Sequence, residues 1–199
     1  GHFFHLLIVA GATPLASRRP APGIWTPCFD PVGVIGCTPY ATIVAVHNVT
    51  WNATSSGVGS TQVIEDAINW ITGGLAEISK EKVKSYHGAR MTMLCAQIKQ
   101  KKAAKQSISH LGPELLEKLS QSADLDKRID EQKNLHIRLS ISSLVSGSIE
   151  LSDGFGEQIK GRIKLEVYPG QDSVQNARDM LVAAAAKAYA ENLPKEFES

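Results

Sequence analysis

The chain has 199 residues, of which 43% are hydrophobic and 21% are charged. This composition is typical of a folded globular protein and excludes a disordered or collagen-like chain. Twenty-one basic and twenty acidic side chains leave a net charge of +1, so no global field attracts the protein to nucleic acid or to an anionic membrane. We therefore expect no specific nucleic acid among its partners.

The first residues contain an apolar run, Phe3–Ala12. The run is shorter than the roughly 20 residues of a transmembrane helix and matches the apolar region of a secretory signal. We predict a leader over residues 1–19 and a secreted protein; the alternative is a cytoplasmic chain in which this run is a buried strand. Sequons that begin at Asn48 and Asn52 predict glycosylation and favour the secretory route.

Prolines and glycines recur over residues 20–40, which predicts an extended arm in front of a single folded domain, residues 41–199. Cys28 and Cys37 lie in the arm, and in an oxidising compartment they could close a small loop while Cys95 stays free. In a reducing compartment, all three are unpaired thiols. The three cysteines fit no metal or redox spacing, so we expect no metal site.

The first half of the domain is predicted from β-branched runs and helical periodicity. Residues 41–51 read as a buried strand, and residues 61–79 carry apolar side chains at helical spacing, although two glycines interrupt the second half. Residues 90–99 could be a strand or the start of a helix, and we favour the strand. The polar segment 100–128 is predicted to be a peripheral helical excursion, with a new turn at Gly112 and Pro113.

The clearest pattern lies between residues 135 and 168. Three runs, 135–141, 145–151 and 159–167, alternate apolar with polar side chains, which is typical of half-buried antiparallel strands. A last helix is expected from a cap at Asp172 to a stop at Pro194. The predicted fold class is α+β: a two-layer sandwich with a mainly antiparallel sheet of four or five strands and two helices packed on one face.

Alternation places Arg138, Lys160, Arg162 and Lys164 together on the polar face of this sheet. One interpretation is a solvated surface that resists aggregation, and the other is a docking surface for an unknown protein or another anionic partner. A second basic group lies nearby in the sequence and consists of Lys99, Lys101, Lys102 and Lys105. It lacks interleaved aromatic residues, which favours a solvated helix face over a nucleic-acid contact.

No catalytic motif emerges. The histidines are scattered, and Gly57-Val58-Gly59 before a helix lacks the lysine of a phosphate-binding loop. We therefore expect no cofactor and a non-enzymatic protein that acts by binding. An enzyme with a site assembled from dispersed residues remains the third alternative.

Two dibasic pairs, Arg18-Arg19 and Lys127-Arg128, fall at predicted element boundaries, where processing proteases cut. This layout resembles that of fungal killer preprotoxins and related small secreted α/β-sandwich effectors. The resemblance implies a secreted, toxin-like protein that acts by binding, and the basic sheet face described above is the candidate contact surface. The alternative is an intracellular binding or assembly subunit that uses the same face or the lysine group against an acidic partner.

Overall fold

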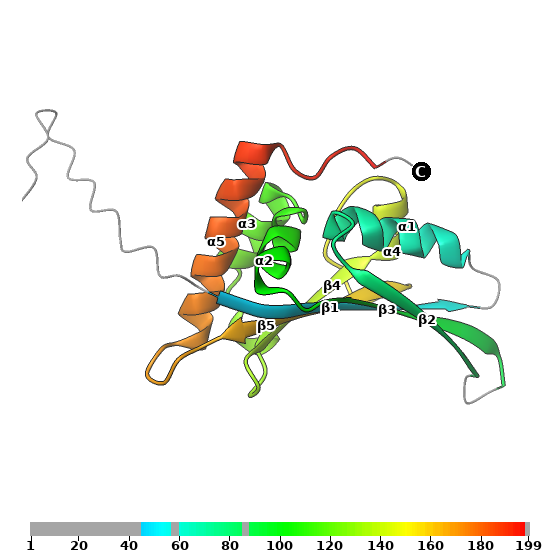
Figure 1. Ribbon diagram of the computed structural model, residues 1–199, viewed down its shortest axis with the longest axis horizontal. Helices are drawn as coiled ribbons and strands as arrows, with labels where there is room; N and C mark the ends of the chain where they lie inside the picture. The colour runs from blue at the N-terminus through cyan, green and yellow to red at the C-terminus, as the bar shows by residue number, and fades with distance from the viewer. Residues whose placement is uncertain (1–44, 57–59, 85–87, 198–199) are drawn as a thin grey trace, which may run out of the picture. The chain divides into compact units, whose positions relative to one another are not determined.

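The computed structural model describes residues 45–56, 60–84 and 88–197, which lie in one compact unit spanning residues 39–199. Five strands form a single sheet in the order β2-β3-β1-β5-β4, and all neighbouring strands are antiparallel (Figure 1). The strands are β1 (Ala45–Ser56), β2 (Glu77–Lys84), β3 (Arg90–Ile98), β4 (Asn134–Ser140) and β5 (Gln158–Glu166). The central strand is therefore β1, flanked by β3 and β5.

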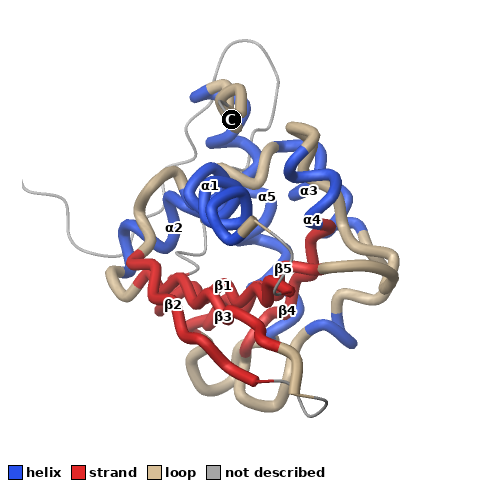
Figure 2. Tube along the Cα trace, turned by 90° about the vertical axis from the view of Figure 1, so that its right-hand side faces the viewer, coloured by secondary structure: helices blue, strands red, loops and turns tan. Residues whose placement is uncertain are grey.

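The α-helices of the described chain all cover the same face of this sheet, and they leave the opposite face open (Figures 1 and 2). They are α1 (Thr61–Thr72), α2 (Lys101–Ser109), α3 (Pro113–Gln121), α4 (Ile141–Val145) and α5 (Ser173–Glu191). The predicted α+β two-layer sandwich is confirmed, with five strands and with three more helices than the two expected. In the described part of the chain, no helix covers the open face.

The core lies between the sheet and the helices. Each of β1, β3, β4 and β5 alternates buried with outward-facing side chains, so one face supplies the sheet's share of the core. Its largest members are Val49, Trp51, Leu94, Ile98, Leu135, Ile137, Leu139, Ile159, Ile163 and Leu165. Because full burial of one such side chain is worth roughly 1.5–3 kcal/mol, this layer makes a large contribution to the stability of the fold.

The predicted strand over residues 145–151 is wrong. The segment contains the short helix α4 and then a loop, and only Leu151 makes an isolated bridge, to Leu139 of β4. Serine side chains explain the difference, because they bond to nearby backbone instead of leaving it free for a sheet ladder. Ser140 Oγ accepts from the N–H of Ser143 at 3.4 Å, and Ser146 Oγ donates to Ser143 O at 2.8 Å.

The predicted helix over residues 61–79 ends earlier, and a strand follows it. Gly73 adopts φ 62°, and the N–H of Gly74 donates to Asn69 O at 2.8 Å, which closes α1 with a left-handed cap. The chain then forms the edge strand β2, which the sequence did not predict. The expected strand over 90–99 is confirmed as β3.

Residues 100–128 belong to the core rather than to the periphery. Ile108, Leu116, Leu119 and Leu125 are at most 1% exposed. Helix α3 packs against α5, whose buried face includes four alanines that allow close approach: Ala177, Ala184, Ala185 and Ala188. The segment therefore completes the helical layer.

Candidate functional site

The open face of the sheet carries a group of cations, which we call the basic patch: Arg138, Lys160, Arg162 and Lys164. Lys160, Arg162 and Lys164 alternate along β5 with buried Ile159, Ile163 and Leu165, so packing of the aliphatic residues turns the cations outward. Arg138 projects in the same way from the edge strand β4. The structure thus brings together the four residues that the alternation predicted to share a face.

Strand register arranges the open face in rows. Arg138 lies opposite Lys160, which lies opposite Asn52 of β1. The next row pairs His136 with Arg162 and continues to Thr50. Residues directly opposite each other on one face have Cβ atoms about 4.5–5.5 Å apart, so the cations adjoin one another and a row of neutral hydrogen-bonding side chains.

Three members of the basic patch have no side-chain partner among the described residues. The side chains of Arg138, Lys160 and Arg162 are exposed, and none forms a hydrogen bond or an ion pair with the residues of the described ranges. Lys164 is half-buried and donates through Nζ to the backbone oxygen of Gln132. These three cations can therefore bind an external anion without first breaking an ion pair among the described residues.

Asp130 sits beside the patch and is committed to internal contacts. Its carboxylate accepts from the backbone N–H of Asn134 at 2.9 Å, from Asn134 Nδ2 at 2.8 Å, and lies 2.9 Å from His136 Nε2. Burial opposes the charged carboxylate, but these hydrogen bonds outweigh it and hold the pKa of Asp130 well below its usual range. Its carboxylate contacts Asn134 and His136 rather than Arg138 or Lys160.

Like charges that face each other across strands destabilise a sheet. Arg138 and Lys160 form such a pair without an intervening acid, so Lys160→Thr should raise the free energy of unfolding by about 0.2–1 kcal/mol, because it removes the repulsion and introduces a β-branched residue. Urea unfolding followed by circular dichroism measures the change. A lower stability would show that Lys160 supports the fold through contacts of its methylene stem.

The lysine group on and before α2 is partly neutralised. Lys99 Nζ lies 3.5 Å from Glu77 Oε2, and Lys101 Nζ lies 2.8 Å from Glu166 Oε2. The hydrogen bond to Glu166 raises the pKa of Lys101 and lowers that of Glu166. Only Lys102 and Lys105 remain exposed without a partner among the described residues, and they project from the helical layer.

A second group of cations lies on the β2–β3 hairpin. The sequence did not predict this group because it did not predict β2. Lys84 of β2 lies opposite Arg90 of β3, and Lys82 shares their face of the hairpin. Lys82 and Lys84 stand an even number of positions from Ile78, so they lie on the same face of β2 as Ile78. This is the face that the helices cover. The group is therefore separate from the basic patch.

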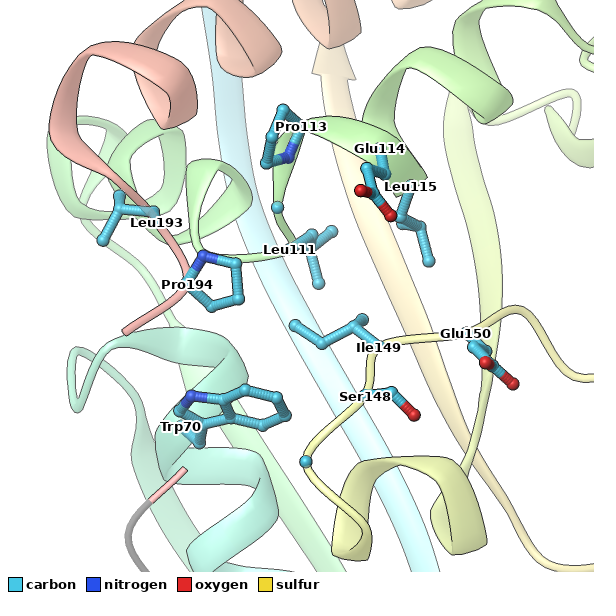
Figure 3. A pocket seen from close by; sticks show the side chains of 12 residues that line it. Trp70, Leu111, Pro113, Glu114, Leu115, Ser148, Ile149, Glu150, Leu193 and Pro194 are labelled. Atoms are coloured by element: carbon cyan, nitrogen blue, oxygen red, sulfur yellow. The ribbon is translucent and has the colours of Figure 1, made fainter. Parts of the chain in front are cut away.

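The helical layer contains a hollow of about 420 Å³. Figure 3 shows Trp70, Leu111, Ile149 and Pro194 around it, with the carboxylates of Glu114 and Glu150 on one side. None of the described residues that line it is basic, and the carboxylates would repel an anion. The hollow does not compete with the basic patch as an anion site.

Only some of the remaining predicted site residues belong to the described part of the chain. Arg18, Arg19, Cys28 and Cys37 lie outside the described residues. Lys127 and Arg128 form one turn of 3-10 helix, where Lys127 Nζ bonds to Asp124 Oδ1 at 2.6 Å. Asn48 and Asn52 are half-buried on the central strand β1, opposite Lys164 and Lys160.

Within the described part of the chain, no group of three or more His, Cys, Asp or Glu side chains could hold a metal ion. None of the helices described here is long and apolar enough to cross a membrane.

An α+β sandwich with unpaired cations on an open sheet face defines a protein suited to bind an anionic partner. A family model described as RNA binding matches residues 59–165, more than half of the chain, and the chain belongs to this family. No curated protein matches the sequence. The family region includes the whole of the basic patch.

Solved structures share the fold. A DUF54 protein from Methanothermobacter thermautotrophicus is 25% identical, with a TM-score of 0.58 over 69% of this chain and 98% of that one. A DUF54 structure from Archaeglobus fulgidus is 24% identical, with a TM-score of 0.54 over 72% of this chain and 99% of the other. A third, from Sulfolobus solfataricus, is 12% identical, with a TM-score of 0.51 over 68% and 98%.

These findings correct three predictions. The family and the archaeal structures contradict the secreted localisation and the toxin-like glycoprotein. Membership in an RNA-binding family also overturns the expectation of no specific nucleic acid. That expectation rested on net charge, whereas local charge on one face governs contact with a polyanion. The intracellular binding protein, given above as the alternative, agrees better with the family.

Proposed function

We propose that this protein binds RNA inside the cell through the open face of its sheet, with the basic patch in contact with phosphates. The observation that carries the proposal is the row Arg138–Lys160, an exposed pair of cations that has no ion-pair partner, and lies on a face that no helix covers, in the described part of the chain. Membership in an RNA-binding family supports the same ligand. Phosphate contacts of this kind supply most of the affinity in nucleic-acid binding.

Neutral polar residues beside the cations complete the surface. On this face of β1, Thr50 is buried, whereas Asn52 and Thr54 are at least partly exposed and lie beside Lys160. Their hydroxyl and amide groups both donate and accept hydrogen bonds, which suits ribose hydroxyls and base edges. Such contacts would add selectivity to the charge-driven affinity, because phosphates carry no sequence information.

The basic patch suits this role better than the lysine group does. Lys99 and Lys101 are already paired with Glu77 and Glu166, and a phosphate would have to displace these carboxylates. Arg138, Lys160 and Arg162 face no such competition within the described chain. Arginine also offers a planar fork of donors that matches a phosphate.

The test replaces one cation at a time. Arg162→Gln should weaken binding of a short fluorescein-labelled RNA of random sequence by about tenfold, or ~1.4 kcal/mol, because one phosphate contact is lost. Fluorescence anisotropy at low salt measures the dissociation constant. Lys105→Gln on α2 removes the same charge from the helical layer and should leave the constant within about twofold, as expected of a site without phosphate contact. Equal effects of the two exchanges would contradict binding on the open face.

A further inference from the structure

Phe155 is exposed to an unusual degree for an aromatic residue. Its side chain is 83% exposed, whereas the next large apolar side chain of the described chain, Tyr189, is 58% exposed. A single exposed apolar residue is common on protein surfaces and assigns nothing by itself. The construction of its loop and the neighbours of that loop carry the argument.

The loop holds its shape without the Phe155 side chain. The N–H of Gly154 donates to Ser152 Oγ at 3.1 Å, and the N–H of Phe155 donates to Asp153 Oδ1 at 3.2 Å. Gly154 and Gly156 have φ of +101° and +76°, conformations that side chains other than glycine rarely adopt. The turn therefore presents the phenyl ring outward while short polar groups satisfy its backbone.

Both ends of this loop are attached to the region of the basic patch. The N–H of Ser152 donates to the backbone oxygen of Arg138 at 2.9 Å, and the N–H of Ile141 donates to Glu157 O at 3.2 Å. Three residues of extended chain span at most about 11 Å, so Phe155 stays close to Arg138. A hollow of about 440 Å³ beside Gly156 is lined by Thr54, Arg138, Lys160, Gln158, Glu157 and Gly156.

The same glycine also borders a second hollow, of about 560 Å³, to which Phe155 contributes together with Glu150 and Asp153. The charge of the surface therefore differs on the two sides of Gly156. On one side are Arg138 and Lys160, which suit a phosphate, although Glu157 also lines that side. On the other side, an exposed ring lies beside two carboxylates, which would repel a phosphate but not a neutral base.

We infer that Phe155 is a stacking surface for an unpaired base of an RNA strand whose phosphates lie on Arg138 and Lys160. The inference rests on the proposed function and names its substrate class, single-stranded RNA. Every base has a flat face that stacks on an aromatic ring, whereas bases inside a duplex have both faces covered. Phe155 therefore makes the protein distinguish a single strand from a duplex of the same sequence.

The experiment compares Phe155→Ala with the unaltered full-length protein on two RNAs: a fluorescein-labelled single strand, and the same strand annealed to its complement. Phe155→Ala should weaken single-strand binding by about tenfold, since stacking one base contributes ~1–3 kcal/mol. Duplex binding should stay unchanged. Phe155→Trp should retain single-strand affinity, and Tyr189→Ala, which removes an exposed aromatic from α5, should alter neither.

The outcomes separate this inference from the proposed function. If Phe155→Ala weakens both RNAs equally, or neither, base stacking on Phe155 is overturned. If instead Arg138→Glu with Lys160→Glu leaves all RNA binding intact, the open face is not the binding surface and the proposed function fails first. The melting temperature of Phe155→Ala should match that of the unaltered protein because the ring is exposed. A lower melting temperature would show that the ring contributes to the stability of the fold.

Discussion

Gly161→Ala is expected to lower the free energy of unfolding by about 3 kcal/mol, which corresponds to a fall of ~6–12 °C in melting temperature for a chain of this size. A Cβ at position 161 would lie 2.3 Å from Cζ3 of Trp51, the residue directly opposite on β1. Trp51 is only 1% exposed, so its ring cannot move aside without displacing the core. Close packing of the interior makes such overpacking destabilising.

A double-mutant cycle tests whether the effect passes through the indole ring. In a Trp51→Leu background, the smaller side chain frees space over β5, and Gly161→Ala should then cost less than about 1 kcal/mol. Urea unfolding of the four proteins gives the coupling energy. An undiminished penalty in the Trp51→Leu background would mean that the strand itself, rather than the ring, requires glycine at position 161.

The sequence predicted the part of the fold where side chains alternate without interruption. In β5, the cations Lys160, Arg162 and Lys164 alternate with inward-facing Ile159, Gly161, Ile163 and Leu165, and this pattern predicted both the buried face and the basic patch. The pattern for residues 145–151 looked similar but included Gly147, which adopts φ +83°, and serines that bond locally. Alternation alone therefore did not distinguish a paired strand from a loop.

The strand β2 escaped prediction for a different reason. Its sequence, Glu77–Lys84, contains only Ile78 and Val83 as apolar residues, since an edge strand beyond the helices buries little on either face. Charged side chains on such a strand also discourage pairing with other molecules. Only its register with β3, a long-range property, identifies it as part of the sheet.

The ligand was misjudged because composition averages over the whole surface. Twenty acids nearly balance twenty-one bases, yet Glu77 and Glu166 are paired with Lys99 and Lys101 and leave the basic patch uncompensated. A polyanion responds to the charges within about one Debye length, roughly 8–10 Å, and not to the sum. The sequence alone does not single out Phe155, because its neighbour Arg138 is distant in sequence.

Arg138→Glu combined with Lys160→Glu should weaken RNA binding by at least about 100-fold at low salt. Each cation lost removes a charge-assisted contact worth ~1.5 kcal/mol or more, and the new carboxylates add repulsion. For a single strand, two lost phosphate contacts should also reduce the slope of log affinity against log salt by about 1.4. Fluorescence anisotropy across a salt series measures both quantities.

The matched control is Lys102→Glu combined with Lys105→Glu on α2, which changes the net charge of the protein by the same amount. If binding depended on the net field, the two double variants would weaken it equally, and the salt slopes would change together. If phosphates lie on the open face, the α2 variant should keep the salt slope of the unaltered protein, because long-range charge changes the rate of association more than the number of phosphate contacts.

The single exchange Arg138→Glu adds an internal comparison. It sets a carboxylate opposite Lys160, so it should stabilise the sheet while it weakens RNA binding. If Arg138→Glu raises the free energy of unfolding but lowers the affinity for RNA, the like-charged pair costs the fold stability and contributes to RNA binding.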